Sequence, residues 1–135
     1  MKLAAPVTVA LPTADRPTAY RFYGDGLGLE AIGEPAEDGV PEPLQFAVDD
    51  GLRIMLVPTG GFGWITGDHE VAPRGHSECV LSVVVETEAA VDDLVARARA
   101  AGAEVVAEPG AQPWGYVGTF ADPDGHLWMI NAQQF

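Results

Sequence analysis

The side chains best suited to acid–base chemistry stand near the middle of the chain. His76 and Glu78 are two residues apart, just before an apolar run, and an imidazole beside a carboxylate could exchange a proton with a substrate. They are the candidate catalytic pair. His69 precedes His76 by seven residues, a spacing that matches no common zinc motif. A solvated linker is the alternative interpretation of this segment.

The chain has a single cysteine, Cys79, which excludes an intramolecular disulfide and a metal site built from several cysteines. We expect a buried, inert thiol at this position. A lone cysteine suits a reducing compartment, so the expected localisation is cytoplasmic. No nucleophile elbow, phosphate loop or dinucleotide fingerprint is present in the sequence.

The charge balance is strongly acidic, with 7 Lys and Arg against 20 Asp and Glu and a net charge of −13. Nucleic acid is excluded as a partner because its binding requires a basic surface. Membranes are excluded too, since no stretch approaches the ~18–20 apolar residues of a span. The negative field would attract cationic small molecules, although surface solubility is the alternative explanation. The length of 135 residues suits one domain over 1–135.

The sequence matches itself at an offset of 74 residues. The matches cluster where strand ends and turns are expected: Gly28, Glu30, Glu34, Pro35, Phe46, Ala47, Asp50, Gly51 and Met55 recur as Gly102, Glu104, Glu108, Pro109, Phe120, Ala121, Asp124, Gly125 and Met129. The offset predicts a duplicated unit, with module one at 7–58, a linker at 59–77 and module two at 78–133.

Each module shows the same order of elements. A β-rich apolar run opens each copy, and a helix follows, with Asp15 as its expected N-cap in module one and Thr87 in module two. Three short strand candidates come next: 29–33, 44–48 and 52–57 in module one, and 104–107, 116–121 and 126–131 in module two. The predicted fold class is therefore α+β. Two βαβββ modules form an open, cup-shaped mixed β-barrel with the helices outside.

The run Gly118-Thr119-Phe120-Ala121-Asp122-Pro123-Asp124-Gly125-His126-Leu127-Trp128 resembles the C-terminal signature of the vicinal oxygen chelate superfamily, which includes glyoxalase I, bleomycin-resistance proteins and extradiol dioxygenases. Residues 14–29 and 91–102 resemble its two helix patterns. The resemblance covers essentially the whole chain and implies the same fold. It also implies a homodimer, because similar members usually pair modules across a two-fold axis. It leaves function open, since lyases, isomerases, dioxygenases and drug binders share the scaffold.

The resemblance also implies a position for a metal. Enzymes of the superfamily typically hold a divalent ion with His or Gln on the first strand of each module and Glu on the last. Carried over, the first-strand positions fall on Thr8 and its repeat mate Ser82, or one or two residues earlier than Ser82. The last-strand positions fall on Met55 and Met129. Hydroxyls are poor ligands and thioethers suit Cu(I), so we predict no metal and no cofactor.

Strand alternation predicts which side chains line a ligand site. Arg53, Met55 and Val57 should share one face, as should Leu127, Met129 and Asn131. The intervening residues Ile54, Leu56, Trp128 and Ile130 should pack under the helices. Aromatic side chains, including Phe120, are candidates for the rim, with core packing as the alternative for each. The predicted ligand-binding residues are Thr8, Phe46, Arg53, Met55, Ser82, Trp114, Tyr116, Met129 and Asn131.

These residues predict a metal-free protein that binds a small apolar or aromatic molecule, similar to the drug-sequestering members of the superfamily. The alternative is a glyoxalase-like or dioxygenase-like enzyme with a non-standard metal, or a metal-independent one that uses His76 and Glu78. A scaffold without a ligand is the third possibility. The charge of the ligand stays open: the acidic surface favours a cation, whereas Arg53 beside Met55 favours an anion.

Overall fold

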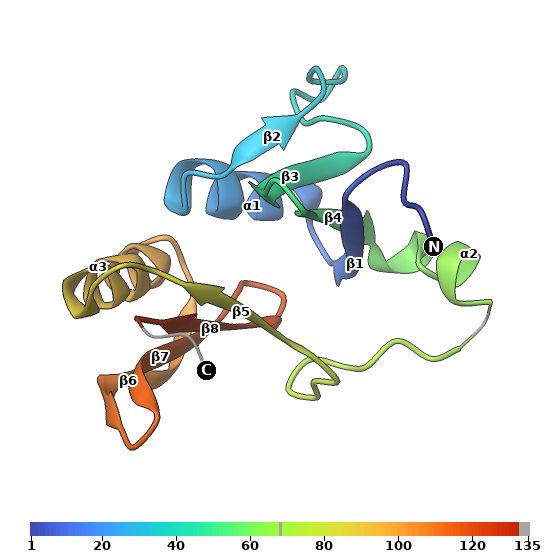
Figure 1. The fold of residues 1–135 in the computed structure, drawn as a ribbon. Coiled ribbons are helices and arrows are strands. Elements are labelled where there is room, and N and C mark those ends of the chain that lie inside the picture. The colour runs from blue at the N-terminus through green and yellow to red at the C-terminus, as the bar shows by residue number, and fades with distance from the viewer. Residues whose placement is uncertain (68, 133–135) are drawn as a thin grey trace. The chain divides into compact units, whose positions relative to one another are not determined.

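The computed structural model describes residues 1–67 and 69–132 (Figure 1). The chain divides into two compact units, Met1–Val71 and the residues from Ala72 onward. This division falls inside the predicted linker. The predicted end of module two, residue 133, lies outside the described residues. The joining of the two sheets into one cup stays a prediction, as does a single domain over 1–135.

The first unit is a mixed four-stranded sheet in the order β1-β4-β3-β2, with β1 parallel to β4. Its elements are β1 (Val7–Thr13), α1 (Arg16–Arg21), the turn of π-helix η1 (Phe22–Gly26), β2 (Glu30–Ile32), β3 (Leu44–Asp49), β4 (Leu52–Pro58), η2 (Thr59–Gly61) and α2 (Gly63–Thr66).

The second unit repeats this arrangement, with the order β5-β8-β7-β6 and β5 parallel to β8. Its elements are β5 (Val80–Val84), α3 (Glu88–Ala100), β6 (Glu104–Gln112), β7 (Gly115–Ala121) and β8 (Leu127–Asn131). Both units have the order βαβββ, so the predicted α+β class and the duplication are confirmed.

The helices α1 and α3 begin at the predicted caps. A carboxylate oxygen of Asp15 accepts a hydrogen bond from the backbone N–H of Thr18 at 3.1 Å, and the hydroxyl of Thr87 accepts from the N–H of Ala90 at 3.0 Å. Each cap satisfies a donor that the first helical turn leaves unpaired. The α3 helix is followed by Gly102, whose φ of +110° suits a residue without a side chain.

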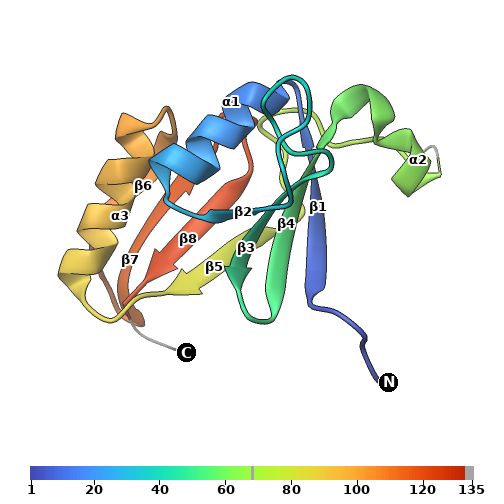
Figure 2. The same ribbon diagram turned by 90° about the horizontal axis from the view of Figure 1, so that it is seen from above.

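Each unit buries the side chains between its sheet and its helix. In the first unit the rings of Tyr20 and Tyr23 pack against Phe46. In the second, α3 lies along one face of β6, β7 and β8 (Figure 2) and buries Val91, Val95 and Ala98. In each sheet one face is therefore covered by a helix, and the opposite face is free of helices within its own unit.

The longest departure from the expected strands is β6, which continues to Gln112 instead of ending near residue 107. Its pairing with β7 shifts register twice, between Val105 and Ala107 and between Ala107 and Gly110. Such bulges let the strand pass Pro109, which has no N–H to donate.

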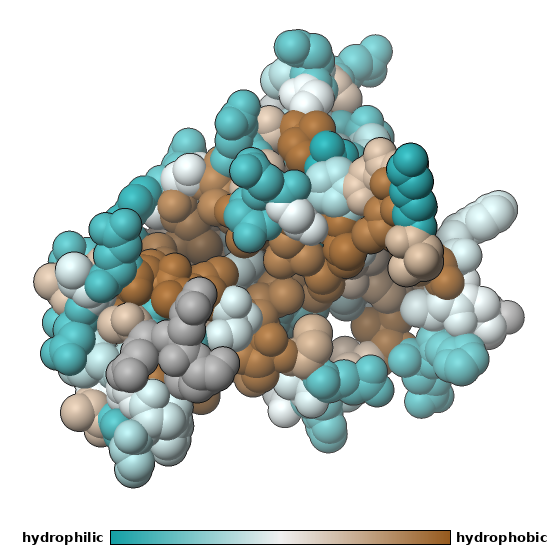
Figure 3. Space-filling model, in the orientation of Figure 1, coloured by the Kyte–Doolittle hydropathy of each residue, from teal (hydrophilic) through white to brown (hydrophobic). Residues whose placement is uncertain are grey.

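In the view of Figure 3, hydrophobic residues gather over the region of β3 and β4, while hydrophilic residues cover the loop beyond β2 and the outer end of α3. Among the described residues, the helices are all too short or too polar to cross a lipid bilayer.

Candidate functional site

The helix-free face of the first sheet is centred on β4. Arg53 and Met55 lie on this face, because the alternating residues Ile54 and Leu56 are buried at 0% and 1% exposure under the helix. Gln45 lies opposite Met55 on β3. The predicted alternation of β4 is therefore confirmed.

Phe46 lies on the other face of this sheet and is a correction to the predicted site. It is directly opposite Ile54 in the β3–β4 register and has 0% exposure. Its ring packs against Tyr20 and Tyr23. The core-packing alternative is the correct one for Phe46, and it cannot line the face that carries Met55.

The first-strand candidate Thr8 shares the face of Met55 but is not its neighbour across the strands. Thr8 lies opposite Arg53, whereas Ala10 lies opposite Met55. The hydroxyl of Thr8 is exposed at the start of β1. In the first sheet the hydroxyl-bearing Thr8 is therefore the neighbour of Arg53, and the small Ala10 is the neighbour of Met55.

The second sheet has a different register. Ser82 lies directly opposite Met129, and Val80 lies opposite Leu127. Thr8 lies opposite the residue two positions before Met55, and Val80 lies opposite the residue two positions before Met129. The structural equivalent of Thr8 is therefore Val80 and not Ser82, which corrects the pairing expected from an offset of 74. Equivalent residues of the two first strands are thus two positions closer in the sequence than equivalent residues of the two last strands. A shift of two residues keeps the side chains on the same face of the sheet.

Asn131 joins Ser82 on the helix-free face of the second sheet. Its side-chain Nδ2 donates to the hydroxyl oxygen of Ser82 at 2.8 Å and to the carbonyl of Val83 at 3.4 Å. The residue is fully buried, and its Oδ1 has no hydrogen-bond partner among residues 1–67 and 69–132. The alternate residues Trp128 and Ile130 are buried, as predicted.

Tyr116 is a second correction. In the β7–β8 ladder its neighbour Val117 lies opposite Asn131, so Tyr116 points to the helix-covered face. Its hydroxyl donates to Oδ1 of Asp92 on α3 at 2.7 Å. This hydrogen bond is the main cause that raises the pKa of the phenol, because ionisation would remove the donated proton beside a carboxylate.

Trp114 occupies the two-residue turn between β6 and β7 and is 52% exposed. It lies at the end of the sheet where Val117 pairs with Asn131. Phe120, in contrast, is fully buried and stacks on Trp128 at a centroid distance of 6.5 Å. The rim position remains a prediction for Trp114 alone.

The candidate acid–base residues His76 and Glu78 lie in the segment before β5, and both are exposed. Within the described residues their side chains form no hydrogen bond or ion pair with each other. The backbone N–H of His76 donates to the carbonyl of Pro73. Cys79 is also exposed, so the expected burial of its thiol is wrong.

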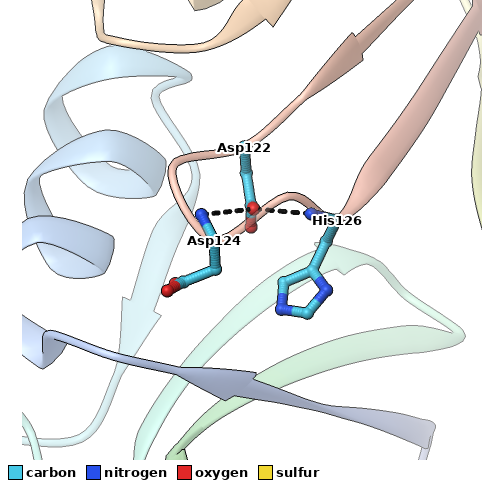
Figure 4. A group of neighbouring side chains, drawn as sticks. All are labelled: Asp122, Asp124 and His126. Carbon is cyan, nitrogen blue, oxygen red and sulfur yellow. Dashed lines mark hydrogen bonds between the residues drawn. The ribbon is translucent and has the colours of Figure 1, made fainter. Parts of the chain in front are cut away.

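Sequence reasoning missed one group of potential ligand atoms. Those of Asp122, Asp124 and His126 lie within 4.8 Å of one another in the turn before β8 (Figure 4). Oδ1 of Asp122 accepts from the backbone N–H groups of Asp124 at 2.9 Å and of His126 at 2.8 Å. The proximity follows from this turn, because a short Asp side chain readily binds the N–H two residues on.

The donors on the paired first and last strands do not fit a hard divalent cation. The side chains on the helix-free faces of β1, β4, β5 and β8 are Thr8, Ala10, Pro12, Arg53, Met55, Val57, Val80, Ser82, Val84, Leu127, Met129 and Asn131. None is a carboxylate, an imidazole or a thiolate, which are the groups that hold Mg, Mn, Fe or Zn.

The family model of the Glyoxalase/Bleomycin resistance protein/Dioxygenase superfamily matches residues 6–130. The chain belongs to this superfamily. The resemblance expected from residues 118–128 is confirmed. Comparison with curated proteins gives no match.

Several solved structures are similar to the chain. A glyoxalase-related enzyme from Fulvimarina pelagi is 28% identical, with a TM-score of 0.79 over 96% of this chain and 88% of that one. TnmS3, an antibiotic binding protein from Streptomyces sp. CB03234, is 26% identical, with a TM-score of 0.65 and 97% of each chain covered. The S. aureus protein SA1046, at 22% identity, has a TM-score of 0.80 with 98% and 96% covered and shows the fold alone.

Proposed function

We propose that the chain is a cytoplasmic, metal-free binding protein of the glyoxalase and bleomycin-resistance type, which sequesters a small apolar or aromatic molecule such as a drug or metabolite. One observation carries the proposal. Methionines occupy the central last-strand position of both modules, and their neighbours on the adjacent first strands, Ala10 and Ser82, are small.

The chemistry of these faces favours an apolar ligand. A thioether is polarizable, adapts its three rotatable bonds to irregular shapes and contacts aromatic rings favourably. A few polar groups beside it can orient a ligand by accepting one hydrogen bond. One is Oδ1 of Asn131, which has no hydrogen-bond partner within the part of the chain that the structure describes. TnmS3, a similar protein described as antibiotic binding, supports binding without chemistry.

A second candidate function is catalysis, which the similarity to a glyoxalase-related enzyme favours. A metal-independent reaction would require His76 and Glu78 to act on the ligand together. Both side chains are exposed, and they form no hydrogen bond or ion pair with each other among the described residues. Turnover of a bound compound that is lost in the variant His76→Ala would establish this function in place of simple binding.

We also propose that the protein pairs as a homodimer. The valines Val80, Val84 and Val106 are 47–54% exposed in the second unit. Covering such side chains gains roughly 25 cal/mol per Å² of apolar surface. Light scattering at micromolar concentration should give twice the 14.2 kDa of one chain. A mass of one chain would contradict pairing.

The experiment for the main proposal combines metal analysis with native mass spectrometry. After dialysis, elemental analysis should find less than about one tenth of a Zn, Ni, Mn or Fe ion per chain. A panel of planar aromatic compounds should then contain at least one that binds at one molecule per chain in the presence of a chelator. One metal ion per chain, or binding that the chelator abolishes, would overturn the proposal.

A further inference from the structure

Arg53 differs from the other cations of the chain by its position. The seven are Lys2, Arg16, Arg21, Arg53, Arg74, Arg97 and Arg99. All seven lie within the described residues, and Arg53 alone belongs to a strand. The others lie on helices, in the segment before β5 or ahead of β1.

Several of these cations have an evident structural partner. Arg16 pairs with Asp38 at 3.0 Å and Glu42 at 3.2 Å, which ties the segment before β3 to α1. Arg99 pairs with Glu108, linking α3 to β6. The guanidinium of Arg53 forms no ion pair or hydrogen bond with any residue in 1–67 or 69–132. Its position on the sheet is therefore not explained by stabilisation of the fold.

The register partners of Arg53 on both neighbouring strands are uncharged. The carboxylate of Asp49, which lies opposite the adjacent Leu52, accepts the backbone N–H of Gly51 at 2.8 Å. Thr8 is its register partner on β1 and Ala47 its partner on β3, at the usual strand spacing of about 4.8 Å. Met55 follows two residues along β4. A carboxylate on the same face, that of Glu30, lies one strand further than Ala47, on the edge strand β2. That is roughly 10 Å from β4 across two strand spacings, and among the described residues no ion pair joins Glu30 to Arg53.

Partial burial makes the guanidinium a strong site for an oxyanion. Arg53 is half-buried against the sheet, so water screens its charge less than at an exposed position. The guanidinium presents several N–H donors in a fixed plane that matches the two oxygens of a carboxylate or sulfonate. The adjacent hydroxyl of Thr8 adds another donor on the same face.

We propose that the ligand carries an oxyanion on an aromatic or apolar body, with the anionic end bound by Arg53 and Thr8 and the body lying on Met55. This inference rests on the proposed function, because it names the class of molecule that the same face binds. It assigns the anion specificity to the first module. The corresponding pair in the second module, Val80 and Leu127, offers only apolar surface.

Two dyes that share an aromatic framework test this inference. The anion 8-anilinonaphthalene-1-sulfonate differs from neutral N-phenyl-1-naphthylamine by its sulfonate group. Fluorescence titrations with both dyes are carried out on the wild type, Arg53→Gln, Arg53→Lys and the control Arg97→Gln. Arg97 is exposed on α3 of the second unit, so its replacement removes the same charge from a helix surface.

The charged dye should bind the wild type more tightly than the neutral dye. In Arg53→Gln its affinity should fall about tenfold or more, as expected for a lost charge-assisted hydrogen bond, while the affinity of the neutral dye stays within about twofold. The affinity of Arg53→Lys for the charged dye should lie between those of the wild type and Arg53→Gln, since lysine keeps the charge but lacks the planar set of N–H donors. Arg97→Gln should change neither affinity. Retained binding of the neutral dye shows that each variant is folded.

Three outcomes would contradict the account in different ways. If the neutral dye binds and Arg53→Gln weakens both dyes equally, the anion inference is wrong and the proposed function stands. The same conclusion follows if Arg97→Gln weakens the charged dye as much as Arg53→Gln does. If the wild type binds neither dye, the proposed function fails and the inference falls with it.

Discussion

The two modules have the same framework and different faces. Met55 and Met129 occupy equivalent places on the last strands, but the residues around them diverge. Module one places Arg53 near its methionine, whereas module two places Ser82 and Asn131 there and binds these two side chains to each other. The duplication thus preserves packing under the helices and leaves the opposite face free to vary.

The difference shows which part of a duplicated fold is constrained. Residues under the helices must fill space at close packing, and in both modules they are large and apolar. Residues on the helix-free face do not pack against a helix of their own unit, so their chemistry can change with less effect on the fold. A function that depends on those residues should differ between the modules, and several variants can test this.

The largest difference between the two modules should be in the pKa of a carboxyl group introduced on the helix-free face of each sheet. In Met55→Glu the introduced carboxyl lies two residues from Arg53, which favours its charged form and lowers its pKa. In Met129→Glu the neighbours Leu127, Ser82 and Asn131 carry no charge, and partial burial raises the pKa. The two carboxyl groups should titrate at least about 1 unit apart, as followed by carbon NMR.

Equal titration of the two introduced carboxyl groups would show that Arg53 does not act on its own face. The control is Asp93→Glu, which places the same carboxyl group at an exposed position on α3. This comparison depends on the register of each sheet and not on any ligand.

A smaller difference should appear in stability. Ser82→Ala removes the acceptor of the 2.8 Å hydrogen bond from buried Asn131 and should lower the free energy of unfolding by about 1 kcal/mol. The matched change Thr8→Ala in module one removes an exposed hydroxyl and should cost less than about 0.5 kcal/mol. Urea denaturation of both variants measures the two costs, and equal losses would contradict the assigned role of Asn131.

The smallest difference concerns the helix caps at low pH. Hydrogen bonds from Thr18 lower the pKa of Asp15, whereas Thr87, the cap of α3, does not titrate. Because the pKa of Asp15 is lowered on folding, its stabilisation is present above the unfolded value near 3.8 and is lost as pH falls through the folded value. The amide signal of Thr18 should shift across that range, and that of Ala90 should not.

The replacement Asp15→Asn should abolish the shift at Thr18, since an uncharged amide still caps the helix and does not titrate with acid. A shift of the same size at Ala90 would point to general acid unfolding instead of a titrating cap.

The sequence predicted the fold well because its signals are local or repeated. The caps Asp15 and Thr87, the glycine at 102 and the alternation of β4 and β8 each follow from a few neighbouring residues. The repeat then supplied the order of elements for both copies.

The sequence predicted the site less well because lining residues depend on register. The face of Tyr116 follows from how β7 pairs with β8, and its hydroxyl reaches Asp92, a residue 24 positions earlier. The mate of Thr8 differs by two residues from the repeat offset because β1 and β5 pair differently with their last strands. For Phe46 the sequence allows either a rim or a core position. Only the pairing of β3 with β4, in which Phe46 lies opposite Ile54, shows that the ring is in the core.

We propose that the methionine-bearing faces bind a small aromatic molecule without a metal. The most direct test titrates N-phenyl-1-naphthylamine against the wild type, Met129→Glu and His126→Ala in the presence of a chelator. His126 lies in the turn before β8, beside Asp122 and Asp124, and serves as the control. Met129→Glu should weaken binding about tenfold or more, because a carboxylate in an apolar lining must be desolvated or protonated, and His126→Ala should leave it unchanged. Binding that survives Met129→Glu and is abolished by His126→Ala would contradict the account.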